Sequence, residues 1–452
     1  MLLDRNIKPE VSRSLKFYPP KIEKLTLHNG LQVYFISKDK LPLIRLSLVI
    51  NAGSKFDPTN KKGLAYLTSM AIDEGAGDYS ALQLSDAFDL MGTNFNITTD
   101  SDSISLTLQS LTENFEKSLE LFSKVLLNPK FASEDFEREK KKLFTRIIQS
   151  KDEPEIIADQ LFDRIIFGEN IGYAYPVMGL EGSVPNIKLK DCLTHYQNYF
   201  SPGNSFLIVA GNIDKQILFG MLERYLFNWK NDYNNFGINQ TFPNQLKKIF
   251  IHHKKDSVQT EIRVGHLTSP RSIDDYFQRL LLNTILGGQF ASRINLNLRE
   301  RNGFTYGANS NFRYFKNAAY FQVSTSVGTE NTINALKEIE FELNEIKNGV
   351  TQTEVEFAKS SITKKFPMHF ETYRQIVGSI STQVFYNLPE DHFETYIDKI
   401  NSVDKKQIDD AALKFISNNY SVVLVGNKDI IAKQLDGSNS DYCLVDLEGN
   451  IL

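Results

Sequence analysis

The seven histidines are the residues of this 452-residue chain best suited to bind a metal or to transfer protons near neutral pH. A zinc site needs histidines, cysteines or carboxylates at ligand spacing. His252 and His253 are adjacent at the start of a predicted strand, so their side chains point to opposite faces and do not readily share a metal. The other five are isolated, with no H-x-x-x-H pattern and no cysteine at ligand spacing: His28, His195, His266, His369 and His392. We interpret all seven as surface or packing residues.

Other nucleophile and phosphate motifs are also missing from the sequence. It contains no G-x-x-x-x-G-K-[ST], G-x-S-x-G or G-x-G-x-x-G pattern. The two cysteines, Cys192 and Cys443, are too few for a disulfide scaffold or a cysteine-rich metal cluster. The residues alone therefore do not predict a self-sufficient active site.

The composition restricts the class of protein and its partners. The chain is 41% hydrophobic, with 32 Phe and 19 Tyr, which is far too apolar for a disordered protein. Its 51 Lys and Arg nearly balance 55 Asp and Glu, giving a net charge of −4. A near-neutral balance provides no electrostatic reason to expect nucleic acid or an anionic membrane as a partner.

The N-terminal residues bear on the compartment. The first 14 residues, MLLDRNIKPEVSRS, lack the apolar core of a signal peptide, and Asp4 and Glu10 are not typical of a mitochondrial transit segment. The most apolar stretch, 41–53, is interrupted by Arg45 and is too short to span a bilayer, so we predict a buried strand there. We expect a cytoplasmic protein by default, with the periplasm as the alternative.

An internal repeat organises the elements that must position any site. Residues 103–114 match residues 320–331 at an offset of 217, and both segments alternate apolar and polar residues as a half-buried strand does. Each then passes through Thr-Glu-Asn into an amphipathic helix, ended by Asn128-Pro129 or Asn348-Gly349. The apolar positions of the two helices are Phe115, Leu119, Phe122 and Leu126, and then Ile333, Leu336, Ile339, Leu343 and Ile346.

The two halves also close alike, because residues 198–214 parallel residues 414–430. We therefore predict an α+β fold that is a tandem repeat of two similar domains, each a mainly antiparallel sheet packed with helices. The N-terminal domain spans 1–229 and the C-terminal domain spans 249–452. The linker, 230–248, is rich in Asn, contains Gly and Pro, and has no apolar period.

Residues 52–96 resemble the segment of the pitrilysin/insulysin and mitochondrial-processing-peptidase zinc enzymes that carries the inverted H-x-x-E-H motif. The resemblance implies a metallohydrolase-like α/β roll. It places Tyr66 and Met70 at the two histidine ligands, Ser69 at the general base, and Arg146 at the third ligand, a glutamate. None of these four is a donor that zinc prefers, and Arg146 is a cation. The resemblance thus implies a degenerate site, with no zinc bound by this chain.

Residues 285–310 resemble the family's C-terminal signature, in which an Arg and a Tyr seven residues later reach the active centre. Here these residues are Arg299 and Tyr306. We predict a helix over 292–300 that ends at Asn302-Gly303, and a strand from Phe304 onward. A guanidinium and a phenol near one turn can donate hydrogen bonds to a carbonyl that gains charge during attack. The structural alternative is that Arg299 favours its helix dipole and that Tyr306 belongs to the core.

The resemblance covers essentially the whole chain and implies a specific role. Some bacterial members of this family are heterodimers, in which one subunit carries the zinc motif and the other supplies the Arg/Tyr pair. This chain resembles the second kind. We expect a non-zinc, substrate-binding subunit, inactive alone, whose partner bears H-x-x-E-H and zinc and whose substrates are unfolded peptides enclosed in a chamber. The alternatives are a non-catalytic, core-like structural subunit and a stand-alone peptide-binding protein.

Overall fold

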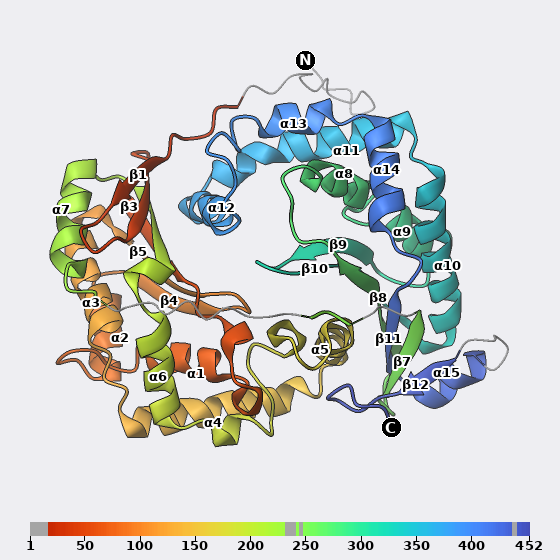
Figure 1. Ribbon diagram of the computed structural model, residues 1–452, viewed down its shortest axis with the longest axis horizontal. Helices are drawn as coiled ribbons and strands as arrows, with labels where there is room; N and C mark the ends of the chain where they lie inside the picture. The colour runs from red at the N-terminus through yellow and green to blue at the C-terminus, as the bar shows by residue number, and fades with distance from the viewer. Residues whose placement is uncertain (1–16, 231–240, 244–246, 436–440) are drawn as a thin grey trace, which may run out of the picture.

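The computed structural model describes residues 17–230, 241–243, 247–435 and 441–452, which form two halves placed side by side (Figure 1). Each half contains one six-stranded sheet with helices packed on it. Most of the predicted linker, 230–248, lies outside the described residues, and the second sheet begins with β7 at Lys248. Within the described ranges, no helix combines the length and the apolar character needed to cross a membrane.

The first sheet has the strand order β1-β2-β6-β3-β5-β4, so β4 lies at one edge. Its neighbours are antiparallel except β2 and β6, which are parallel. At its centre Leu46 pairs with Leu108, and all of the even-numbered apolar residues of β3 are buried, as their alternation predicts. The strands are β1 (Glu23–Thr26), β2 (Gln32–Ser37), β3 (Leu43–Ile50), β4 (Asn94–Thr99), β5 (Ile104–Leu111) and β6 (Ser205–Gly211).

The second sheet has the order β12-β7-β11-β8-β10-β9, and its edge strand β9 corresponds to β4 of the first. Here β12, β7 and β11 are parallel and the remaining pairs are antiparallel. The α+β prediction is confirmed, and both sheets are mixed rather than purely antiparallel. The strands are β7 (Lys248–His253), β8 (Gln259–Thr268), β9 (Ala308–Tyr314), β10 (Ala319–Gly328), β11 (Ser421–Gly426) and β12 (Tyr442–Leu444).

The helices alternate with the strands in a similar way in both halves, although four α-helices separate β5 from β6 and five separate β10 from β11. In the first half they are α1 (Leu64–Ala71), α2 (Ala81–Leu90), α3 (Phe115–Leu127), α4 (Ser133–Ser150), α5 (Pro154–Phe167), α6 (Leu189–Tyr199) and α7 (Lys215–Leu226). In the second they are α8 (Tyr276–Leu286), α9 (Arg293–Asn295), α10 (Thr332–Glu345), α11 (Gln352–Lys365), α12 (Tyr373–Phe385), α13 (Tyr396–Ser402), α14 (Lys405–Phe415) and α15 (Lys428–Leu435). A π-helix, Leu296–Arg301, continues α9.

The repeated segment folds in both halves as its pattern predicts. Each copy is a strand, then a 3-10 turn made by Thr-Glu-Asn, then a helix, α3 or α10. The predicted apolar positions of both helices are buried, with Leu336 partly so. The same period therefore produces the same local structure twice.

Two equivalent helices are exchanged between the halves. α5, from the first half, packs against β8 and β11 of the second sheet, while α12, from the second half, packs against β3 and β6 of the first. The Phe162 ring of α5 meets the Tyr320 ring edge-on, with centroids 5.2 Å apart. The Tyr373 hydroxyl of α12 donates hydrogen bonds to the carbonyls of Lys38 and Leu41, each at 3.1 Å. In Figure 1, α12 projects toward the first sheet and α5 lies beside the second.

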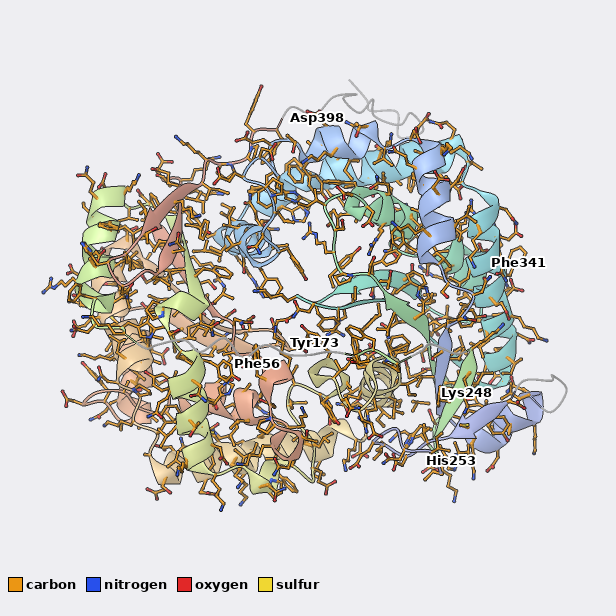
Figure 2. All side chains as sticks on the ribbon, in the orientation of Figure 1. Phe56, Tyr173, Lys248, His253, Phe341 and Asp398 are labelled. Carbon is orange, nitrogen blue, oxygen red and sulfur yellow. The ribbon has the colours of Figure 1, made fainter. Side chains whose placement is uncertain are left out.

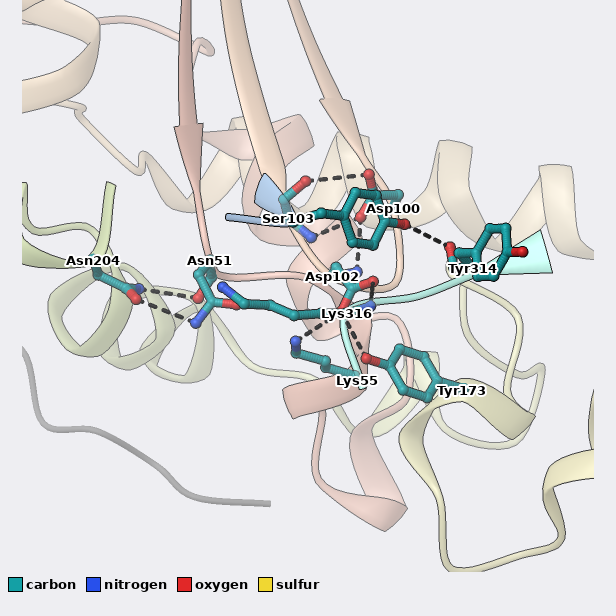
Figure 3. Close-up of polar contacts among 10 residues, drawn as sticks. Asn51, Lys55, Asp100, Asp102, Ser103, Tyr173, Asn204, Tyr314 and Lys316 are labelled. Atoms are coloured by element: carbon teal, nitrogen blue, oxygen red, sulfur yellow. Dashed lines mark hydrogen bonds and ion pairs between the residues drawn. The ribbon is translucent and has the colours of Figure 1, made fainter. Parts of the chain in front are cut away.

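The tips of the two equivalent hairpins, β4–β5 and β9–β10, meet between the halves (Figure 3). Asp102 of the first tip accepts hydrogen bonds from the Lys55 ammonium and the Tyr173 hydroxyl, both at 2.7 Å. It also accepts one from the backbone N–H of Lys316 in the second tip, at 3.1 Å. Burial and the nearby Lys55 charge lower the pKa of the Lys316 ammonium. The Lys55 ammonium also lies 4.9 Å from the ring centroid of Phe56, which Figure 2 labels next to Tyr173.

Candidate functional site

Three of the positions that the resemblance aligns with the zinc site, Tyr66, Ser69 and Met70, lie on α1, and the fourth, Arg146, lies on α4. α1 begins after Gly63, whose φ of 99° is a left-handed conformation that favours glycine. Asp57 accepts hydrogen bonds from the N–H groups of Gly63, at 2.8 Å, and Ala65, at 2.9 Å, and so satisfies the start of the helix. Burial raises the pKa of Asp57 to about 7, against the opposing effect of these hydrogen bonds.

The structure brings three of the four predicted positions together. The Tyr66 hydroxyl accepts a hydrogen bond from Nη1 of Arg146, on α4, at 3.4 Å. Ser69 is buried; its hydroxyl donates to the Tyr66 carbonyl and accepts from the Thr99 hydroxyl of β4, both at 2.7 Å. Met70 is half-buried and packs against the hydrophobic core of the first half.

These side chains do not fit a zinc ion. The set consists of a phenol, a buried hydroxyl that already has two hydrogen-bond partners, a thioether and a guanidinium. Zinc requires imidazole, thiolate or carboxylate donors, and a guanidinium would add positive charge beside the metal. Within the described part of the chain, no group of three or more His, Cys, Asp or Glu residues is arranged to hold a metal.

Arg299 lies on the π-helix Leu296–Arg301 rather than on an ordinary α-helical turn. The wider turn is visible in its hydrogen bonds, since the Asn302 N–H donates to the Asn297 carbonyl at 3.1 Å. Short π-helical turns are rare and are often found at functional sites. Asn297 holds this turn: its buried side-chain amide donates to Glu342, at 2.7 Å, and to Glu338, at 2.9 Å.

The Arg299 side chain is 36% exposed and contacts an aromatic ring. Its guanidinium carbon lies 4.5 Å from the ring centroid of Phe290, a cation–π contact, and its Nε is 3.5 Å from a Glu300 carboxylate oxygen. Phe290 is itself 64% exposed. The sequence analysis did not identify Phe290. The available signal was an aromatic residue that directly follows Gly287-Gly288-Gln289, but the sequence does not show that its ring is exposed.

Tyr306 lies in a loop, and the strand predicted from Phe304 begins only at Ala308. The reason is a local turn: the Thr305 hydroxyl donates to the Gly307 carbonyl, at 2.9 Å, and accepts from the Gly307 N–H, at 3.1 Å. The Tyr306 side chain is 94% exposed, so it is not a core residue. Within the described residues no hydrogen bond joins Arg299 to Tyr306, and Tyr306 lies two residues before the edge strand β9.

Three of the histidines illustrate that each ring has its own partner in the structure. His252 and His253 come at the end of β7, not at its start, and bond to different groups: the Val445 carbonyl at 3.0 Å and the Lys428 N–H at 3.1 Å. His195 is buried, with Nε2 3.1 Å from the Ala52 carbonyl. Burial lowers the pKa of His195 to about 4.

The geometry defines a class: an α+β protein of two similar halves, each with a six-stranded mixed sheet covered by helices. Comparison with known proteins agrees. Residues 33–174 match the family model described as insulinase, peptidase family M16, and residues 186–362 match the model of the peptidase M16 inactive domain. The chain belongs to peptidase family M16.

Full-length relatives carry differing descriptions. An uncharacterized zinc protease of Rickettsia felis is 23% identical over 89% of this chain and 97% of its own length. A protein of Helicobacter pylori described as the non-peptidase homolog YmxG is 23% identical over 86% of this chain and 90% of its own length. The solved structure of a peptidase M16 inactive domain from Pseudomonas fluorescens is 25% identical, with a TM-score of 0.83, and covers 90% of this chain and 98% of the other.

Proposed function

We propose that this chain is the non-zinc, substrate-binding subunit of a heterodimeric zinc metallopeptidase that acts on unfolded peptides. The observation that carries the proposal is a contrast between the two halves. In the first half, Tyr66 and Arg146, which the resemblance aligns with zinc ligands, are hydrogen-bonded to each other. In the second, Arg299 lies on a π-helical turn, and the exposed Tyr306 lies two residues before the edge strand β9.

In the proposed assembly, the metal and its activated water belong to a homologous partner that bears H-x-x-E-H. This chain contributes Arg299 and Tyr306, whose guanidinium and phenol orient the peptide carbonyl and stabilise the oxyanion as charge develops on it. Removing one such donor typically costs on the order of 10²–10³ in rate. An extended peptide can add to an edge strand through main-chain hydrogen bonds, with loose sequence preference.

The test uses the heterodimer reconstituted with an H-x-x-E-H partner. Arg299→Ala and Tyr306→Phe are each expected to lower kcat/KM for a peptide substrate by at least about tenfold while assembly is unchanged, because each removes a hydrogen-bond donor used in the transition state. Arg301→Ala is the matched control, since Arg301 is an exposed arginine of the same π-helix. Activity within about twofold of wild type in both test variants would contradict the transition-state role.

Assays of the chain alone test the proposal that it is inactive without its partner. The purified chain is expected to hydrolyse no peptide. Hydrolysis by the isolated chain that a chelator abolishes would show that a metal site exists elsewhere. Purification of the native complex adds an independent measurement: a partner of similar size with H-x-x-E-H supports the proposal, whereas recovery in a membrane complex supports a structural subunit instead.

A further inference from the structure

Arg146 stands out among the basic residues of α4. Arg138, Lys142 and Arg146 follow one another at intervals of four residues and therefore share a helix face. Arg138 forms ion pairs with Glu74, Asp135 and Glu139, and Lys142 pairs with Glu139 at 2.6 Å. In the described part of the chain, no carboxylate lies within ion-pair distance of the exposed Arg146 guanidinium, which contacts only the Tyr66 hydroxyl, at 3.4 Å.

Tyr66 adds a second donor at the same point. Its hydroxyl accepts the hydrogen bond from Arg146, so its own proton is left to donate, and no acceptor for that proton is present among the described residues. A guanidinium beside a phenol provides several N–H and O–H donors and no anion. Such a pair is complementary to a carboxylate, which accepts at two oxygens.

The edge strand β4 runs past this pair. β4 is paired on one side only, with β5, and Thr99 at its end is joined through Ser69 to the turn of α1 that carries Tyr66. At its other end, Asn94 and Phe95 line a cavity of about 500 Å³. Arg138 and Lys142 of α4 also line this cavity, together with three carboxylates, Asp73, Glu74 and Asp89. Unpaired strand edges accept an additional strand through main-chain hydrogen bonds.

We propose that the former metal position is a carboxylate-binding site, at which Tyr66 and Arg146 bind a carboxylate of an extended peptide added to β4. The ligand chemistry is a carboxylate, supplied either by the peptide's C-terminus or by an acidic side chain. The residues that disfavour a metal are the ones that bind the anion. The positive charge of Arg146 attracts the carboxylate, and the Tyr66 hydroxyl orients it by donating a hydrogen bond. The site uses this chain alone and does not depend on the proposed heterodimer.

The test measures peptide binding to the full chain by fluorescence anisotropy. The probes are three versions of one neutral, N-terminally labelled decapeptide: the free acid, the C-terminal amide, and the amide with one internal glutamate. Wild-type protein is expected to bind the free acid, the glutamate-containing amide, or both, at least about fivefold more tightly than the plain amide. The version that is favoured identifies the source of the carboxylate.

Variants assign that preference to the site. Arg146→Gln is expected to remove it and leave the affinity for the plain amide unchanged, and Tyr66→Phe is expected to reduce it. Lys141→Gln, an exposed lysine of α4 that does not line this cavity, is the matched control and keeps the preference. Because Arg146 is exposed, its replacement is expected to leave the thermal unfolding midpoint unchanged.

Three results would overturn the inference: equal affinity of wild type for all three peptides, a preference that survives in Arg146→Gln, or no binding of any of them. The heterodimer assay with Arg299 and Tyr306 variants is separate. A heterodimer that is active and sensitive to those variants, with no carboxylate preference in this chain, would contradict only the present inference.

Discussion

His195 illustrates how burial turns an isolated histidine into a determinant of stability. It lies at the interior of the first half, its ring 4.7 Å from the Tyr199 ring, and its Nε2 contacts the Ala52 carbonyl. Burial lowers its pKa to about 4, below the value of about 6.5 expected in an unfolded chain. The folded protein therefore resists protonation at this position, and the unfolded chain takes up the proton first.

The consequence is a stability term that is fully present above about pH 6.5 and is lost as the pH falls toward 4, because the unfolded state binds more protons in that range. Wild type is expected to lose roughly 3 kcal/mol more than His195→Gln between pH 7 and pH 4. Glutamine keeps a donor for the Ala52 carbonyl but does not titrate. Urea unfolding of both proteins at the two pH values measures the difference, and parallel pH profiles would show that His195 does not contribute.

For single residues, the sequence indicates which positions differ from the family's zinc motif. It does not indicate which contacts the side chains at these positions make with one another. Tyr66, Ser69 and Met70 were found because they fall within one short motif, and Arg146 was found through the same family resemblance. The contact between Arg146 and Tyr66 joins residues 80 positions apart, and spacing carries no information about it. The cation–π contact between Arg299 and Phe290 was not predictable either, because it depends on the direction of the two side chains.

Among the elements, the π-helix that carries Arg299 is the clearest departure from the predicted pattern. The sequence predicts a helix over 292–300, and a helix is present, but its wider turn depends on a side-chain network rather than on apolar period. Asn297 provides that network through buried hydrogen bonds to Glu338 and Glu342, while its own carbonyl and Oδ1 accept from the Asn302 side-chain amide.

Asn297→Ala is expected to destabilise the protein by about 1–3 kcal/mol, because it leaves the buried Glu342 carboxylate without this donor. It is also expected to lower kcat/KM of the proposed heterodimer, because the turn that holds Arg299 is no longer fixed. Thermal unfolding and peptide hydrolysis, measured on the same preparations, check the two effects. Loss of stability with full activity would show that Asn297 supports the fold and does not position Arg299.

The helices α5 and α12 show a second limit of sequence-based prediction. An apolar face at helical spacing indicates that a helix is covered on one side, but not which sheet covers it. α5 is followed by the rest of its own half along the chain, yet it packs on β8 and β11. The strand-turn-helix repeat was predictable because its contacts are local, whereas the exchange depends on residues more than 100 positions apart.

For the whole molecule, the duplication was predictable from sequence, and the contact between the equivalent hairpin tips was not. At that contact, Asp102 is the common acceptor for Lys55, Tyr173 and the backbone of Lys316 (Figure 3). Lys55 and Asp102 form an almost fully buried ion pair, with side chains 3% and 8% exposed. A buried pair of this kind is sensitive to the loss of one partner, because the other charge remains in a medium that solvates it poorly.

Asp102→Ala is therefore expected to cost about 3–5 kcal/mol, whereas the double substitution Lys55→Met with Asp102→Leu is expected to cost substantially less, since it leaves no unpaired charge. Chemical denaturation of the two variants tests this order. The opposite order, with the double variant less stable than Asp102→Ala, would show that the unpaired Lys55 charge is not the main cost of removing Asp102.

The exchange of α5 and α12 has a consequence for the origin of such a chain. Each half contacts the other through the same three features: a sheet face, a helix that packs on the other half's sheet, and a hairpin tip. A polypeptide of half this length, with the same fold, would expose one sheet face and one helix to solvent. A second copy of that polypeptide would cover both. Such an ancestor would be a two-fold symmetric, helix-swapped homodimer. Fusion of its two subunits would then free each half to diverge.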